Sequence, residues 1–265
     1  MRRLTVVLVL VSLPLAAAAC GGSSKPKAAA PNATAGASAM NVVKSAAAKT
    51  ALAGSEHVAL TVGGTDAGQK LAVTGSGDFD NKHHIGSLHV DFAAGGINAS
   101  MDTVLSTTSM YLKSPLFSTL LPSGKSWLKL DLKKTAAAQG LNLNTLLSQD
   151  PTQTLDALQS LTGATKVGSA QVGGVSTTHY RARIDVSKLP GAAAKGARGG
   201  TYDVWIGDDG YVYRVRTKIT TASGSQKAVV TLTTDLSDFG QKVSVAVPAA
   251  SQTMTSTGSL PGLGG

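Results

Sequence analysis

Strict alternation of apolar and polar side chains is the feature that most constrains how this chain of 265 residues can fold. The stretches HVALTV (57–62), SLHVDF (87–92) and SWLKLDL (126–132) each place an aliphatic or aromatic side chain at every second position. Successive side chains of a β-strand point to opposite faces, so each stretch predicts a strand with one buried face. In the first two stretches the buried positions are Val58, Leu60, Val62, Leu88, Val90 and Phe92.

A β-hairpin is predicted in TYDVWIGDDGYVYRVRTKIT (201–220), where two alternating runs flank the turn Gly207–Gly210. The Asp-Gly pair in this turn supplies the positive φ that a tight hairpin requires. Together with the other alternating stretches, the hairpin predicts a largely antiparallel sheet.

Helices are few in the sequence. One is predicted over Asn41–Leu52, and a second begins at an N-cap, Asp150, and ends at Gly163. A sheet with helices packed on one face is an α+β architecture. A leucine-rich stretch just before the second helix is also predicted to be helical and contributes Leu143, Leu146 and Leu147.

The single cysteine, Cys20, follows a short basic start, an apolar run over 4–13 and four small residues. This order is the layout of a secretory signal peptide, and the apolar run is shorter than the roughly 20 residues that cross a bilayer. A cysteine directly after the small residues resembles the bacterial lipobox, whose thiol is acylated. Residues 1–19 are therefore predicted to be a lipoprotein signal peptide and Cys20 the lipid attachment site. The alternative is an ordinary signal peptide with an unrelated cysteine.

The composition of the two ends predicts how the rest of the chain is divided. Residues 20–39 comprise the acylated cysteine and a stretch of Gly, Ser, Ala, Pro and Lys that is typical of a flexible tether. Residues 249–265 have little to bury and are predicted to be a disordered tail. One folded domain is expected between them, over 40–248.

Motifs that carry catalysis or bind metals are absent from the sequence. It contains no G-x-S-x-G, no G-x-x-x-x-G-K-[ST] and no H-E-x-x-H pattern, and Cys20 is its only thiol. The adjacent His83 and His84 are interpreted as polar surface residues, because neighbouring strand positions point in opposite directions. We therefore expect no enzymatic activity, no catalytic residue, no metal site and no cofactor.

The charge balance is basic, with 24 Lys and Arg against 15 Asp and Glu. The basic residues are dispersed and are not interleaved with stacking aromatic residues, which argues against a nucleic-acid partner. On a lipid-anchored protein such charge favours contact with anionic lipid headgroups.

The apolar residues are mostly aliphatic, since only 4% of the chain is aromatic. A long sheet lined by Val, Leu and Ile can close around space and hold a small apolar ligand. It can equally pack into a filled aliphatic core. The composition leaves both alternatives open.

The order of several segments resembles the actinobacterial lipoproteins of the LppX, LprA, LprF and LprG family. The segments that carry the resemblance are MYLKSPLFSTLLPSGKSWLKLDL, DPTQTLDALQSL, KVGSAQVGGVSTTHYRARIDVSKL, YDVWIGDDGYVYRVR and LSDFGQKVSVAVPAAS, in that order. The resemblance implies a strongly curved antiparallel sheet, a half-barrel, with helices packed on its concave face. It also implies similarity to the periplasmic lipoprotein carriers and a non-catalytic role.

Members of the family hold acylated lipids or glycolipids between sheet and helices, so the resemblance implies the same class of ligand here. The expected function is an envelope lipoprotein, anchored to the outer face of the cell membrane, that carries or presents such a lipid together with an envelope transport protein. The alternative is a ligand-free interaction or sensing module on a similar scaffold. The candidate cavity lining is Val58, Leu60, Val62, Leu88, Val90, Phe92, Leu143, Leu146 and Leu147.

Overall fold

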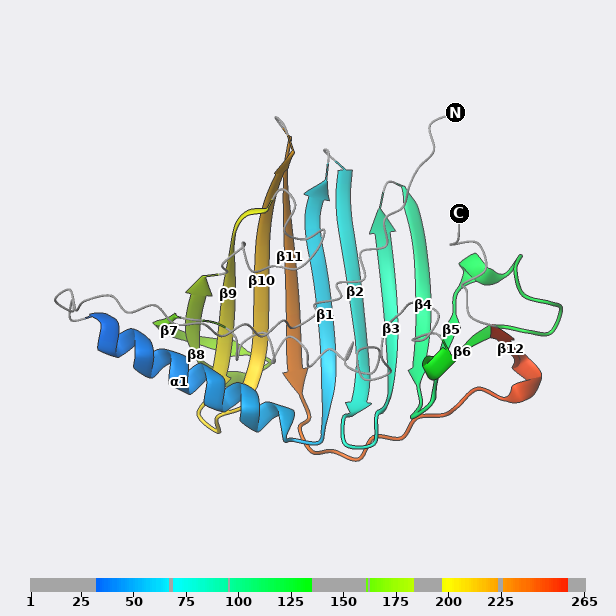
Figure 1. The fold of residues 1–265 in the computed structure, drawn as a ribbon, viewed down its shortest axis with the longest axis horizontal. Helices are drawn as coiled ribbons and strands as arrows, with labels where there is room; N and C mark the ends of the chain where they lie inside the picture. Colours follow the sequence, from blue (N-terminus) through cyan, green and yellow to red (C-terminus); the bar gives the residue numbers. More distant parts are fainter. Residues whose placement is uncertain are drawn as a thin grey trace.

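The computed structural model describes residues 32–66, 69–94, 96–134, 161, 163–183, 197–223 and 226–256. They form one open sheet of twelve strands, and helix α1 (Asn32–Ala51) lies across one end of it (Figure 1). The strands are β1 (Ser55–Asp66), β2 (Gln69–Asp80), β3 (Ile85–Ala94), β4 (Ile97–Leu105), β5 (Ser109–Lys113), β6 (Trp127–Asp131), β7 (Ala164–Val172), β8 (Val175–Arg183), β9 (Ala197–Gly207), β10 (Val212–Ser223), β11 (Gln226–Ser237) and β12 (Thr253–Ser256).

Two runs of consecutive strands, β1–β6 and β7–β11, build the sheet, and β12 is added at the edge beside β6. The order is β12-β6-β5-β4-β3-β2-β1-β11-β10-β9-β8-β7, so the two runs meet where β1 pairs with β11. Neighbouring strands are antiparallel except for β12 and β6, which are parallel. The predicted hairpin is confirmed as β9 and β10, and its turn is closed by the amide of Gly210 donating to the carbonyl of Gly207 at 2.8 Å.

The two faces of the sheet differ in polarity. We call the face that carries Val58 and Leu60 the apolar face, and the face that carries Thr61 and Thr233 the polar face. Two core clusters lie on the apolar face. One contains buried residues of α1 together with Val58 and residues of β8–β11, and the other contains Leu112, Leu128 and Leu130 of β5 and β6. The first cluster lies where α1 covers the sheet.

Helix α1 begins well before the predicted start at Asn41, within the segment that was expected to be a tether. Val43 is 1% exposed and Ala47 is fully buried against the sheet, whereas Val42 is 40% exposed. The prediction of a helix up to Leu52 is therefore right in type and wrong in its start. Ala-rich sequence looks like a linker because it offers little to bury, but alanine has the highest helix propensity, and packing on a sheet stabilises it further.

The predicted disordered tail is also wrong in its first part. Residues 253–256 form β12, which pairs with β6, and Met254 packs against the second core cluster. The amide of Ser126 donates to the carbonyl of Gln252 at 3.0 Å and fixes the entry to this strand. A short strand with one apolar side chain gives almost no periodic signal, so the sequence pattern does not reveal it.

The predicted fold class is confirmed in its coarse form, as one large, almost wholly antiparallel sheet with a helix against it. The strong curvature and the packing of helices on a concave side stay predictions. Most of the helix predicted from Asp150 to Gly163, the segment with Leu143, and Cys20 fall outside the described residues. None of the described helices is long and apolar enough to cross a membrane.

Gly77→Ala is expected to lower the free energy of unfolding by about 1–3 kcal/mol, the usual cost of overpacking. A Cβ at Gly77 would lie 1.9 Å from the carbonyl oxygen of Ser87 and 2.8 Å from the Cα of Leu88, so the backbones of β2 and β3 must separate. Gly63→Ala on β1 is the control, because a Cβ there meets nothing within 4 Å. Urea unfolding of both variants measures the difference, and equal stabilities would contradict the packing described here.

Candidate functional site

The six strand residues predicted to line a cavity share the apolar face. The register aligns Val58 with Gly77 and Leu88, Leu60 with Gly75 and Val90, and Val62 with Val73 and Phe92, in three rows across β1, β2 and β3. Paired residues on antiparallel strands point to the same side, so the predicted parity is confirmed. Whether these residues line a ligand cavity stays a prediction. The remaining candidates, Leu143, Leu146 and Leu147, lie outside the described residues.

The rows continue onto neighbouring strands that the sequence analysis did not include. Val90 pairs with Met101 of β4, and Val62 pairs with Leu232 of β11. Between Leu60 and Val90, a Cβ at Gly75 would lie 3.3 Å from the Cγ of Leu60 and 3.1 Å from a methyl carbon of Val90. The glycine therefore lets the two aliphatic side chains approach each other across β2.

This set forms a strip between the two core clusters. We call it the central strip and define it as Leu60, Val62, Val73, Val90, Phe92, Met101 and Leu232. Its side chains are half-buried, whereas Val58 in the neighbouring cluster is fully buried. The central strip is thus a part of the apolar face where aliphatic side chains are accessible, which is the chemistry that an acyl chain requires.

A buried hydrogen bond fixes α1 on the apolar face beside the central strip. The hydroxyl of Thr50, which is fully buried, donates to the carbonyl of Ala46 at 2.8 Å and accepts from the amide of Val212 at 2.9 Å. Lys49 donates to the carbonyl of Asp209, and its ammonium lies 4.5 Å from the ring centroid of Tyr211. The end of α1 is therefore attached to the β9–β10 hairpin.

Thr50→Val is expected to lower the free energy of unfolding by about 1–3 kcal/mol, because the buried amide of Val212 loses its acceptor while the side-chain shape is kept. Thr50→Ser retains the hydroxyl and is expected to cost less. Urea unfolding compares the two. A valine variant as stable as the wild type would show that the amide finds another partner.

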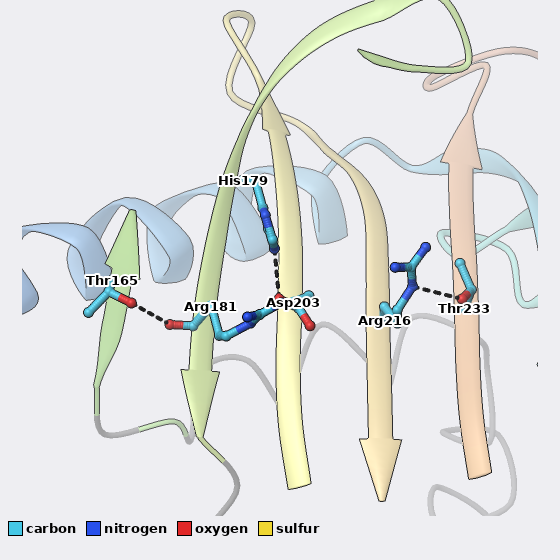
Figure 2. Close-up of polar contacts among 6 residues, drawn as sticks. All are labelled: Thr165, His179, Arg181, Asp203, Arg216 and Thr233. Carbon is cyan, nitrogen blue, oxygen red and sulfur yellow. Dashed lines mark hydrogen bonds and ion pairs between the residues drawn. The ribbon is translucent and has the colours of Figure 1, made fainter. Parts of the chain in front are cut away.

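The polar face carries a network of side chains on β8–β11 (Figure 2). Asp203 is buried and accepts from Nε2 of His179 at 2.7 Å and from Nε of Arg181 at 2.6 Å. On the neighbouring strands, Nε of Arg216 donates to the hydroxyl of Thr233 at 3.4 Å. The network lies on the opposite side of the strands from α1.

Trp205 lies beneath this network. The ring of His179 stacks on it with the two centroids 4.3 Å apart, and the guanidinium of Arg216 lies 5.1 Å from its centroid. Arg214 forms a two-point ion pair with Asp235, and the hydrogen bond that it donates to this carboxylate raises the pKa of Arg214. The sequence analysis missed this network. The signal was present in the alternation of β8, β9 and β10, which places Arg181, Asp203, Arg214, Arg216 and Lys218 on one face.

Three further histidines, His57, His83 and His89, are accessible polar residues that each pair with an aspartate. Nδ1 of His83 lies 2.7 Å from Asp80 in the β2–β3 turn, which is a turn and not the strand that the sequence analysis assumed. Nδ1 of His89 lies 2.5 Å from Asp102, and this hydrogen bond is the main cause that raises the pKa of His89. Within the described ranges, no group of three or more His, Cys, Asp or Glu side chains is placed to hold a metal ion.

These features define a class of protein built on a single open sheet whose apolar face is covered at one end by a helix. LprF from Mycobacterium bovis has this fold, with a TM-score of 0.54 and 16% identity over 81% of this chain and 98% of that one. The lipoprotein LppX from Mycobacterium tuberculosis aligns with a TM-score of 0.49 and 16% identity over 79% of this chain and 99% of that one. No family model and no curated protein sequence matches the chain.

At this identity the likeness to LprF concerns the fold. It confirms, at that level, the resemblance to the LppX and LprF lipoproteins that the order of the sequence segments indicated.

Proposed function

We propose that this protein is a lipid-anchored lipoprotein of the cell envelope that binds an acylated lipid or glycolipid on its apolar face and carries or presents it. The central strip supplies the contacts for the acyl chains. From its predicted helical pattern, we propose that the segment with Leu143, Leu146 and Leu147 covers these chains. Each methylene removed from water contributes about 0.8 kcal/mol, so two acyl chains suffice for stable binding without any polar recognition.

The observation that carries this proposal is the run of half-buried aliphatic side chains across β11, β1, β2, β3 and β4, between two filled core clusters. A sheet that only needed a core would bury these positions as fully as Val58. The fold shared with the lipoprotein LprF and the signal layout that ends at Cys20 support the same assignment. The role is non-catalytic, with binding and release as its chemistry.

Mass spectrometry of organic extracts from the purified protein tests the proposal. We expect one class of acylated lipid in near-stoichiometric amount. Extracts that contain only lipids of the bulk membrane, in proportions that follow the host, would favour the ligand-free interaction module instead.

A further inference from the structure

A hollow of about 550 Å³ lies on the polar face, away from the central strip. The residues that line it occupy two neighbouring cross-strand rows of β8–β11. Figure 2 shows the row that runs from Arg181 through Asp203 and Arg216 to Thr233. The lining side chains are of only two kinds, charged groups and hydroxyls. The lining consists of Arg181, Thr201, Asp203, Arg216, Lys218, Thr231 and Thr233.

The hollow has an excess of positive charge. Three cations face one carboxylate, and that carboxylate, Asp203, already accepts hydrogen bonds from His179 and Arg181. Neither Arg216 nor Lys218 forms an ion pair with any carboxylate of the described residues. Cations that converge on one hollow without compensation raise the local concentration of anions there.

The guanidinium of Arg216 is held in a fixed position with its outer nitrogens unoccupied by the described residues. Arg216 is fixed by its inner nitrogen, Nε, on Thr233 and by its contact with the ring of Trp205. Its two terminal nitrogens make no hydrogen bond to the residues that the structure describes. A planar guanidinium held in this way can donate two parallel hydrogen bonds to one oxyanion.

We propose that this hollow binds a phosphate group. Arg216 donates in bidentate fashion, Lys218 and Arg181 balance the charge, and the threonine hydroxyls supply further donors. The volume exceeds that of a bare anion, so the ligand carries a substituent beyond the phosphate. The phosphate belongs to a lipid headgroup at the membrane surface or to a soluble phosphorylated molecule. The site lies on the face opposite the central strip, so it is independent of the proposed acyl-chain binding.

Titration of the purified full-length chain with pyrophosphate in phosphate-free buffer tests the site. Trp205 lies under Arg216 and reports binding by its fluorescence, and a Trp127→Phe background removes the only other tryptophan. We expect saturable binding that weakens with salt. Arg216→Gln removes the bidentate donor and Lys218→Gln removes a neighbouring positive charge, and each should weaken binding by about tenfold or more.

The matched control is Lys70→Gln on β2, which removes the same charge from an exposed position on the same face, outside the hollow. It should leave binding unchanged. Lys218→Gln keeps the test interpretable if Arg216→Gln fails to fold. Lys218 has no hydrogen-bond or ion-pair partner among the described residues, so its substitution removes no contact that stabilises the sheet. Circular dichroism melts confirm that each variant is folded.

Co-sedimentation with vesicles separates the two sources of phosphate. Wild type and Arg216→Gln are compared on vesicles of phosphatidylcholine alone and of phosphatidylcholine mixed with phosphatidylglycerol. If the protein binds the anionic vesicles more strongly and this extra binding requires Arg216, the phosphate belongs to a lipid headgroup. If pyrophosphate binding is saturable but the anionic vesicles bind no more protein than the neutral ones, the ligand is a soluble phosphorylated molecule. If neither is seen, or if Lys70→Gln causes the same loss as Arg216→Gln, the proposal is overturned.

Discussion

Val90→Trp is expected to abolish lipid loading while the protein stays folded. Val90 lies in the middle of β3 on the apolar face, between Gly75 and Met101 in its cross-strand row. Val90 is half-buried, and its neighbour Gly75 has no side chain that an indole would have to displace. If the central strip holds acyl chains, the indole occupies their volume, and the extracted lipid should fall to background with little change in the melting temperature.

A packed core predicts the opposite outcome for the same variant. Overpacking there costs typically about 1–3 kcal/mol and would lower the melting temperature by several degrees. Thr74→Trp is the matched control, because it adds the same ring at an exposed position of β2 on the polar face. It should retain both lipid and stability. Strong destabilisation by Val90→Trp, in a wild type that yields no lipid, would end the lipid-binding proposal.

Cys20→Ala should move the protein from the membrane to the medium, or leave it as an uncut precursor. This prediction rests on the run of small residues that ends at Ala19, directly before the only thiol of the chain. One acyl chain gives only marginal membrane binding and two or more give stable anchoring, so loss of the attachment site has an all-or-none effect. Partition into Triton X-114 measures it.

Ser23→Ala is the control for Cys20→Ala, since it changes a nearby small residue and leaves the thiol in place. It should partition into detergent like the wild type. A Cys20→Ala protein that still enters the detergent phase at its mature size would contradict the anchor assignment.

The two proposed binding sites lie on opposite faces of the sheet and differ in chemistry. The central strip offers aliphatic contacts, while the hollow at Arg216 and Lys218 on the other face offers cations. Since β1 and β11 carry both faces on alternate residues, a ligand bound to one face lies one sheet thickness from the other. Lipid loading and phosphate binding are therefore separable by mutation, and Val90→Trp and Arg216→Gln should each leave the other activity intact.

The sequence by itself determined which residues share a face. The positions of Val58, Leu60 and Val62, and of the turn at Gly210, follow from backbone geometry over a few residues, so alternation and an Asp-Gly pair predict them correctly. The same local rule gave no measure of how deeply each side chain is buried. Val58 is fully buried in the core cluster that also contains residues of α1, whereas its neighbour Leu60 is half-buried and lies outside that cluster.

Only the tertiary structure decided the extent of α1, the presence of β12 and the existence of the hollow on the polar face. Thr50 and Val212 are 162 residues apart, and no local pattern connects them. Arg181 and Arg216 each look like an ordinary solvent-facing strand residue, and they form a site only because β8, β9 and β10 lie side by side in register. Local geometry specifies the direction of a side chain, whereas its neighbours depend on which distant segments pair.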